Sequence, residues 1–201
     1  MNDAYFLQNK ENLIANIEFT AFDFETTGLS PNRDRIVEIG AVRFRNGQVY
    51  GTYESLINPG IPIPPKVTSI HGITDGMVED KPSAEDMLPD FLGFIHGSVL
   101  VAHNAPFDTR FLFSELKRAG SAPPKAVILD SLPLSRKAFP GRKSYKLQDL
   151  APFFSVPVSN AHRACDDAQV CMKVFSNCIK ELEEKKGNIM FSELTDMCRY
   201  F

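Results

Sequence analysis

The chain has 201 residues, of which 43% are hydrophobic and 23% charged, and its formal net charge at pH 7 is −3. This balance excludes a disordered chain and a membrane-spanning one, and the length suits one domain with a substantial core. The negative net charge argues against a nucleic-acid partner, because phosphate binding normally requires a basic surface.

The amino terminus shows no basic segment followed by an apolar run, so we expect neither a signal peptide nor an anchor and predict a cytoplasmic protein. The four cysteines contain no C-x-x-C pair, which argues against a zinc site and a disulfide framework. Cys171 and Cys178 recur at helical spacing and are interpreted as small buried hydrophobic residues.

Three apolar or alternating runs come first, at residues 16–28, 34–47 and 48–60, each bounded by Gly, Asn or Pro. This pattern is typical of consecutive antiparallel strands and predicts a three-stranded meander. The proline-rich residues 58–65 cannot continue the sheet.

Helices and strands alternate after the meander. The spacing of apolar residues predicts helices and strands in this order: a helix at 83–97, a strand at 98–104, a helix at 106–120, a strand at 126–132, and helices at 146–154 and 164–186. We therefore expect an α/β fold, a mixed five-stranded sheet with helices on its faces. The last residues, 186–201, form either a small additional helix or a partner-binding tail.

Asp23 and Glu25 place two carboxylates in the first predicted strand. Because a strand repeats every two residues, both point to one face while Phe22 and Phe24 point to the other. Adjacent carboxylates repel, and burying them without a partner is costly, so we expect a positive group between them. Hydroxyls and backbone N–H groups follow at once, which suits a phosphate bound through a metal; they belong to Thr26, Thr27 and Gly28.

Two later segments add polar candidates. Asp108 lies in the first turn of a predicted helix, where a carboxylate also serves as a plain N-terminal charge. His162 precedes a helix that carries Asp166 and Asp167. Five residues of unbroken helix would turn His162 and Asp167 about 140° apart, so a shared site requires His162 to lie in the preceding loop. Taken singly, such a histidine is more often a surface residue than a catalyst.

Three ordered motifs resemble those of one family. The chain carries DFETTG, HNAPFD and HRACDDA, and so is similar to the DEDDh exonucleases of the ribonuclease-H-like fold, whose motifs are D-x-E-T-T-G, H-N-x-x-F-D and H-R-A-x-x-D-A. The stretches SIHGITDGMVEDKP and SRKAFPGRKSYKLQDLA also look like those of the proofreading epsilon subunit of bacterial DNA polymerase III. The resemblance implies a DEDDh exonuclease domain over residues 1–185, with a ribonuclease-H-like sheet covered on both faces, and an extension of unknown role over residues 186–201.

The resemblance also implies a metal site with a general base. Two Mg²⁺ or Mn²⁺ ions would be held by Asp23, Glu25, Asp108 and Asp167, and His162 would be the base. Hard divalent ions take oxygen ligands, and a pair can bind the scissile phosphate, activate water and neutralise the leaving oxygen. Histidine, with an ordinary pKa of about 6.5, suits proton transfer at neutral pH. Substrate contacts are expected from Thr26, Thr27, Gly28, His71, Asn104, Phe107, Arg142 and Lys143.

Two bound divalent ions answer the objection from net charge, because they add four positive charges to −3. Basic and aromatic residues also alternate over residues 135–146, which is typical of a single-stranded nucleic-acid path, although a solvated loop has the same composition. For His71 a structural turn is the alternative, His103 is expected to support the site, and Asp166 to be solvated or to cap its helix.

We therefore predict a 3′-to-5′ exonuclease that hydrolyses phosphodiester bonds by two-metal catalysis, releases nucleoside 5′-monophosphates and proofreads DNA. Its expected partners are a single-stranded 3′ end of DNA, or alternatively of RNA, and the catalytic subunit of DNA polymerase III, with no membrane. The rival hypotheses are a free-standing exonuclease of the same fold that repairs DNA or trims RNA, and a non-catalytic nucleic-acid-binding adaptor.

Overall fold

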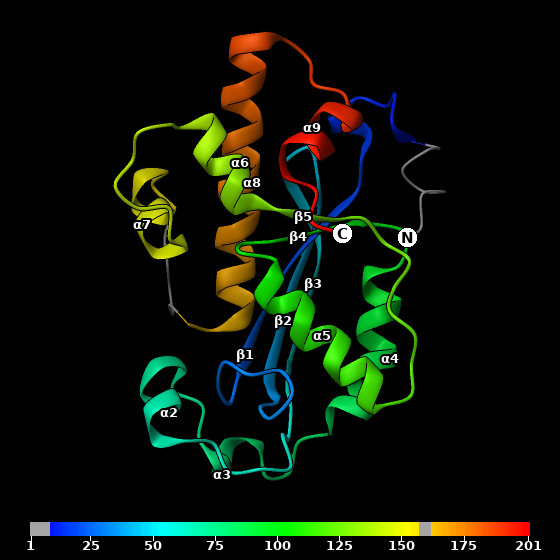
Figure 1. Ribbon diagram of the computed structural model, residues 1–201, viewed down its shortest axis with the longest axis vertical. Coiled ribbons are helices and arrows are strands. Elements are labelled where there is room, and N and C mark those ends of the chain that lie inside the picture. Colours follow the sequence, from blue (N-terminus) through cyan, green and yellow to red (C-terminus); the bar gives the residue numbers. More distant parts are fainter. Residues whose placement is uncertain (1–8, 157–161) are drawn as a thin grey trace.

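The computed structural model describes residues 9–156 and 162–201. Within these residues five strands form one sheet, in the spatial order β3-β2-β1-β4-β5 (Figure 1). β1, β2 and β3 pair antiparallel, whereas β4 runs parallel to β1 and β5 parallel to β4. The predicted mixed five-stranded sheet is confirmed. Its strands are β1 (Phe19–Thr26), β2 (Ile36–Arg45), β3 (Gln48–Leu56), β4 (Val99–Ala102) and β5 (Ile128–Asp130).

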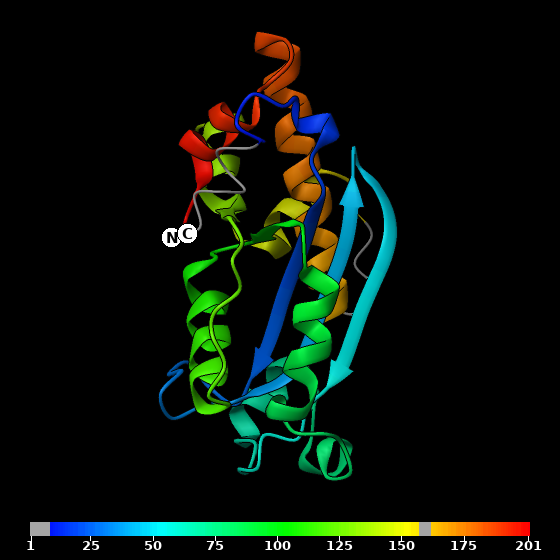
Figure 2. The ribbon, with the colours of Figure 1, turned by 90° about the vertical axis from the view of Figure 1, so that its right-hand side faces the viewer.

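Helices cover both faces of the sheet. The long helix α8 (Ala164–Lys186) lies across β1 and β2. On the same face lie α6 (Ser131–Ala138), α7 (Leu147–Phe153) and α9 (Phe191–Cys198). The opposite face is covered by α4 (Ala84–Ile95) and α5 (Pro106–Arg118) (Figure 2). Each face therefore has its own hydrophobic core, and the sheet separates the two.

The alternation of side chains along β1 divides these cores. Phe19 and Ala21 pack on the α8 side, whereas Phe22 and Phe24 pack on the α4 and α5 side. Because alternate residues of a strand share a face, Asp23 and Glu25 continue the row of Phe19 and Ala21 toward α8. The facing predicted from the sequence is confirmed, and it directs both carboxylates at the amino-terminal end of α8.

Several short elements were not predicted. Along the chain they are the 3-10 turn η1 (Ile14–Asn16) and the helices α2 (Pro65–His71), α3 (Asp75–Val78) and α6. α6 begins directly after β5 because the Asp130 carboxylate caps it, accepting a hydrogen bond from Leu132 N at 2.9 Å. The strand predicted at 126–132 is correspondingly shorter.

The last residues pack into the domain. Of the two alternatives for residues 186–201, the structure shows the additional helix, α9, whose Phe191, Leu194 and Cys198 are buried in the α8 core. The chain then pairs with β5, where Tyr200 N donates to Ile128 O at 2.8 Å. Cys171 and Cys178 are buried and free, as predicted.

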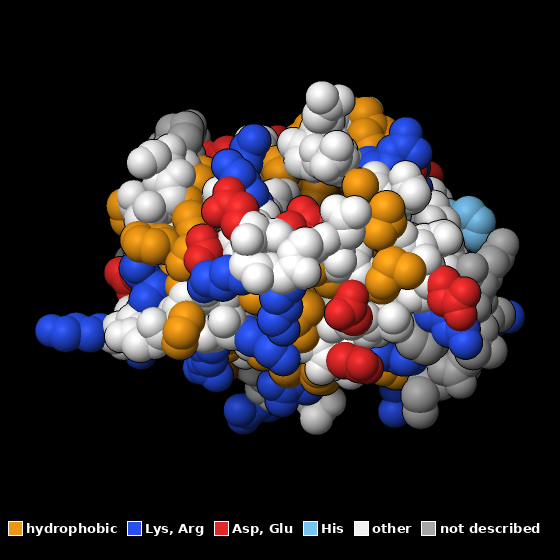
Figure 3. Space-filling model, turned by 90° about the horizontal axis from the view of Figure 1, so that it is seen from above, with side chains coloured by type: hydrophobic (Ala, Val, Ile, Leu, Met, Phe, Trp, Pro, Cys, Tyr) orange, Lys and Arg blue, Asp and Glu red, His pale blue; other side chains and the backbone are white. Residues whose placement is uncertain are grey.

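Among the described residues, none of the helices has the length and apolar character that crossing a bilayer requires. Figure 3 shows acidic and basic side chains intermingled on the face seen from above.

Candidate active site

Asp23 and Glu25 lie at the carboxyl-terminal half of β1, on the face toward α8. The strand continues its hydrogen-bonded pairing with β2 on both sides of them, Asp23 opposite Gly40 and Glu25 opposite Glu38. The ladder is regular from Phe19 to Glu25, with a register shift only between Glu25 and Thr26, so both side chains leave the strand on one face. Glu25 therefore faces a second acid, Glu38, across the ladder.

Asp108 approaches the carboxyl-terminal half of β1 from α5. It lies in the first turn of α5, is 2% exposed, and its Oδ1 accepts a hydrogen bond from Phe24 N at 3.2 Å. The turn before the helix has Asn104 in the left-handed region (φ 67°), and Asn104 N donates to Asp130 Oδ1 at 2.9 Å. Because β4 is parallel to β1, the loop after β4 opens at the same edge as the end of β1. Parallel pairing thus brings Asp108 to Asp23 and Glu25.

His162 and Asp167 lie just before α8 and in its first turn, respectively. His162 lies in the loop before the helix, with a left-handed φ of 63°, and its backbone N–H donates to Asp167 Oδ2 at 3.2 Å. The loop position that a shared site requires is confirmed. One ligand atom each from Glu25, His162 and Asp167 lies within 4.8 Å of the others. Asp166, in the same first turn, is partly buried, and its charge contributes to raising the pKa of Asp167.

The position of the amino-terminal end of α8 against the sheet depends on two residues of β2 that the sequence analysis did not single out. Glu38 is fully buried; its carboxylate accepts from Arg163 Nε at 3.0 and 3.1 Å and from Ala164 N at 2.9 Å. A Cβ on Gly40 would lie 2.1 Å from the carbonyl carbon of Ala164, so only glycine lets the helix approach the strand this closely. The signal was present: an acid and a glycine within the apolar residues 36–42 of the strand are unusual.

The four carboxyl groups of the site all have raised pKa values. Burial raises the pKa of Asp23 well above its usual range, and Asp108, Glu25 and Asp167 raise it further. Burial, with the charges of Asp167 and Glu38, raises the pKa of Glu25 to about 8. Burial likewise raises the pKa of Asp108 to about 7, and raises that of Asp167. Neighbouring carboxylates whose pKa values are all raised by burial fit hard divalent cations, which take oxygen ligands and would favour their ionised forms.

Three residues expected to contact substrate, Thr26, Thr27 and Gly28, lie at the end of β1 or directly after it. Thr26 and Thr27 are buried, and Thr26 Oγ1 donates to Gly28 O at 2.7 Å. His71 is buried at the end of α2; burial lowers its pKa, and the Thr26 backbone is the chief influence in the opposite direction. Leu29, directly after Gly28, is a large apolar residue that is 85% exposed.

The remaining expected contacts differ in how free their side chains are. Asn104 is exposed, whereas Phe107 is partly buried against Phe111, with ring centroids 5.1 Å apart. The guanidinium of Arg142 lies 3.8 Å from the centre of the Phe153 ring and donates to Asp149 O at 3.4 Å. Lys143 is exposed. The protein itself thus engages Arg142, while the Lys143 ammonium is open to a ligand.

His103 fastens this basic loop to the sheet. Its Nε2 donates to Tyr145 O at 2.7 Å, which leaves Nδ1 of a neutral ring to accept from Ser131 Oγ at 2.7 Å. Burial lowers the pKa of His103, which favours that neutral ring. These contacts agree with the supporting role expected for His103.

Known proteins resemble this chain over most of its length. A family model described as an exonuclease (RNase T) matches residues 20–175. The chain is 46% identical over 167 residues to a PolC-type DNA polymerase III of Caldanaerobacter subterraneus, covering 83% of this chain but only 12% of that protein. It is 44% identical over 174 residues to the DNA polymerase III subunit epsilon of Treponema pallidum, covering 86% of this chain and 81% of the subunit.

Solved structures show the same architecture. Exonuclease X, solved in complex with 5′ overhanging duplex DNA, superposes with a TM-score of 0.71 at 28% identity, over 89% of this chain and 98% of that one. Exonuclease I superposes with a TM-score of 0.73 at 20% identity, over 90% of this chain and 43% of that one. The sheet and its two helix layers are therefore a fold shared with exonucleases.

Proposed function

The chain belongs to the exonuclease family whose model spans residues 20–175, and on this premise we propose that it is a metal-dependent 3′-to-5′ exonuclease that acts on DNA. The observation that carries the proposal is the meeting of four carboxylates from β1, α5 and α8 beside His162. Their raised pKa values mark a site built to receive cations, and family membership supports a nuclease reaction.

The proposed ligands are Asp23, Glu25, Asp108 and Asp167, holding two Mg²⁺ or Mn²⁺ ions. When bound, such ions would supply Lewis-acid chemistry and neutralise the charge that develops on the phosphate. The protein residues provide the geometry: the β1 ladder holds Asp23 and Glu25, and the Phe24 N–H orients Asp108. In the same way, the His162 N–H orients Asp167.

His162 is the proposed general base. Its backbone is tied to Asp167, so its imidazole is held beside the carboxylates, where a ring nitrogen could accept a proton. Taking the proton from the attacking water lets that oxygen add to phosphorus as the 3′-oxygen leaves, which releases a nucleoside 5′-monophosphate. Proposed contacts to the terminal nucleotide come from Thr26, Thr27, Gly28, Leu29, His71, Asn104, Phe107 and Lys143.

The proposed setting is proofreading, with the catalytic subunit of DNA polymerase III as partner, in the cytoplasm. Support comes from the two relatives of DNA polymerase III, one an epsilon subunit of similar extent. A free-standing exonuclease is the second candidate, favoured by the match to 98% of the Exonuclease X chain. Degradation of matched and 3′-mismatched DNA, with and without polymerase, distinguishes these settings.

The activity itself is tested on 5′-labelled single-stranded DNA and on RNA of the same sequence, with Mg²⁺, Mn²⁺ or chelator. We expect metal-dependent shortening from the 3′ end, with 5′-monophosphates identified by mass spectrometry and calorimetry counting the Mn²⁺ ions. Asp167→Asn should abolish cleavage, whereas Asp166→Asn, the matched control one residue away, should retain it. Cleavage in chelator, or products that carry 3′-phosphates, would contradict the proposal.

A further inference from the structure

The loop between β1 and β2, residues 27–35, closes on itself through its own backbone and side chains. Thr27 N donates to Arg35 O at 2.9 Å, and Arg35 N donates back to Thr27 Oγ1 at 3.0 Å. Asp34 Oδ2 accepts from Ser30 N at 2.7 Å. A Cβ on Gly28 would lie 2.5 Å from that same oxygen, so the glycine makes room for the carboxylate inside the loop. This β1–β2 loop thus has one compact conformation.

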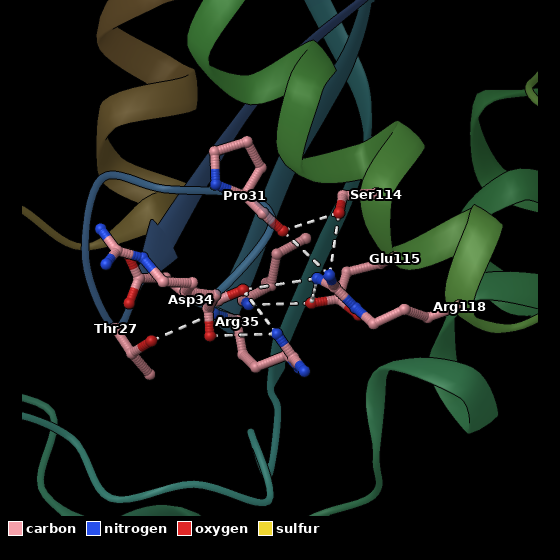
Figure 4. Close-up of polar contacts among 9 residues, drawn as sticks. Thr27, Pro31, Asp34, Arg35, Ser114, Glu115 and Arg118 are labelled. Carbon is pink, nitrogen blue, oxygen red and sulfur yellow. Dashed lines mark hydrogen bonds and ion pairs between the residues drawn. The ribbon is translucent and has the colours of Figure 1, made fainter.

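Helix α5 grips the β1–β2 loop from outside, through side chains on one face (Figure 4). Ser114 Oγ donates to Pro31 O at 2.6 Å, and Arg118 Nη1 donates to the same carbonyl at 2.9 Å. Arg118 Nη2 also approaches Asp34 O at 3.4 Å. Two loop carbonyls that would otherwise turn to water are therefore bonded to a rigid helix.

Glu115 holds the Arg118 guanidinium in the orientation that this grip requires. Its side chain is 5% exposed and accepts from Arg118 Nε at 3.0 Å and Nη2 at 2.7 Å. Its Oε1 also lies 3.4 Å from Ile36 N, the first residue of β2. A bidentate pair of this kind fixes the plane of the guanidinium, which a lysine could not reproduce.

The same helix carries Asp108. Seven residues, about two turns, separate Asp108 from Glu115, so both lie on one face of α5. Through Asp108 the helix contacts β1 just before the loop, and through Glu115 it contacts β2 just after it. One rigid body therefore sets the position of the β1–β2 loop relative to the carboxylates.

We propose that Ser114, Glu115 and Arg118 form a latch that positions the β1–β2 loop for binding the terminal nucleotide. This inference rests on the proposed function, because Thr27, Gly28 and Leu29 in that loop are its proposed substrate contacts. The latch residues act through the loop and touch no reacting atom. Loosening the latch should weaken substrate binding and leave both the metal ligands and the chemical step in place.

The test variants are Arg118→Lys, which keeps a cation for the buried Glu115, and Ser114→Ala. Lys117→Ala is the control, because it removes a charge from an exposed neighbour in the same turn of α5. Hydrogen exchange of loop amides, including Ser30 N, reports the latch directly. Thermal melts establish that each variant is folded. If Arg118→Lys does not fold because the Arg118–Glu115 pair tolerates no change, Ser114→Ala still tests the latch.

We expect Arg118→Lys to raise KM for a single-stranded oligonucleotide about tenfold, the scale of one or two lost hydrogen bonds, with kcat within about twofold of wild type. Ser114→Ala should show a smaller rise, and Lys117→Ala none. Mn²⁺ affinity should be unchanged, and loop amides should exchange faster in the two latch variants. Faster exchange with unchanged KM would overturn the inference, as would a fall in kcat and Mn²⁺ affinity without a rise in KM.

The failure of the proposed function gives a different result. If wild-type protein degrades no DNA, that proposal is wrong, and oligonucleotide binding by fluorescence anisotropy takes the place of KM. Weaker binding by Arg118→Lys than by Lys117→Ala would then still support the latch. Equal binding by the two variants would overturn it.

Discussion

Glu25→Gln in the metal-free protein should increase stability, by an amount that grows as pH rises from about 4.5 to above 8. The pKa of Glu25 rises from its ordinary 4.5 to about 8 in the fold, through burial and the charges of Asp167 and Glu38. Below pH 4.5 Glu25 is protonated in both the folded and the unfolded protein. As pH rises from 4.5 to 8 the unfolded chain loses this proton first, so the free energy of unfolding falls. The raised pKa of Glu25 therefore costs the fold about 3 kcal/mol at pH 7, where the folded protein keeps a proton that the unfolded chain has released, and about 5 kcal/mol above pH 8, where Glu25 is ionised in both states. Glutamine has nearly the same shape and carries no charge.

The assay is urea unfolding with chelator at pH 5 and pH 8.5, with Glu184→Gln as the control, because the Glu184 side chain on α8 is 63% exposed. We expect Glu25→Gln to change the free energy of unfolding by less than about 1 kcal/mol at pH 5 and to raise it by roughly 2–5 kcal/mol at pH 8.5. Saturating Mg²⁺ should reverse the order by stabilising only wild type strongly. Equal stability of the two proteins at pH 8.5 would refute the reasoning that burial and repulsion make an ionised Glu25 costly to the fold.

Three further predictions concern the base, the seat of α8 and the basic loop. His162→Ala should lower the single-turnover rate by about two to four orders of magnitude, with Mn²⁺ and DNA affinity near wild type; a matching loss of Mn²⁺ affinity would make it a ligand instead. Gly40→Ala should destabilise the protein by about 1–3 kcal/mol and weaken Mn²⁺ binding by moving α8. Gly51→Ala is the control and should change neither, because the nearest atom to its Cβ would be 3.4 Å away, an ordinary contact distance. Lys143→Ala should reduce the salt slope of single-stranded DNA binding by about 0.7, and an unchanged slope would leave Lys143 as a solvated residue.

Local pattern was enough to predict the frame of the fold, whereas the set of candidate site residues came from the resemblance of three motifs to one family. Alternating residues marked the strands and set Asp23 and Glu25 on one face, and helical periodicity required His162 to precede α8. The short helices α2 and α6 escaped prediction, and length alone does not explain this, because α7 has as few residues as α2 and was predicted. Asp130 caps α6, but it is also the last residue of β5, so the sequence pattern assigned it and the residues after it to a strand.

The sequence by itself determined which residues repeat, alternate or terminate an element, since those properties depend on near neighbours. Only the tertiary structure decided which distant groups meet. Glu38 and Arg163 are 125 residues apart, and Ser114 binds a carbonyl 83 residues away. Arg142 was expected from the sequence to contact substrate, but its guanidinium lies over the ring of Phe153, 11 positions along the chain. Such contacts follow from how α5, α7 and α8 dock on the sheet, because docking depends on the shapes and charges of complete surfaces, and no local spacing records them.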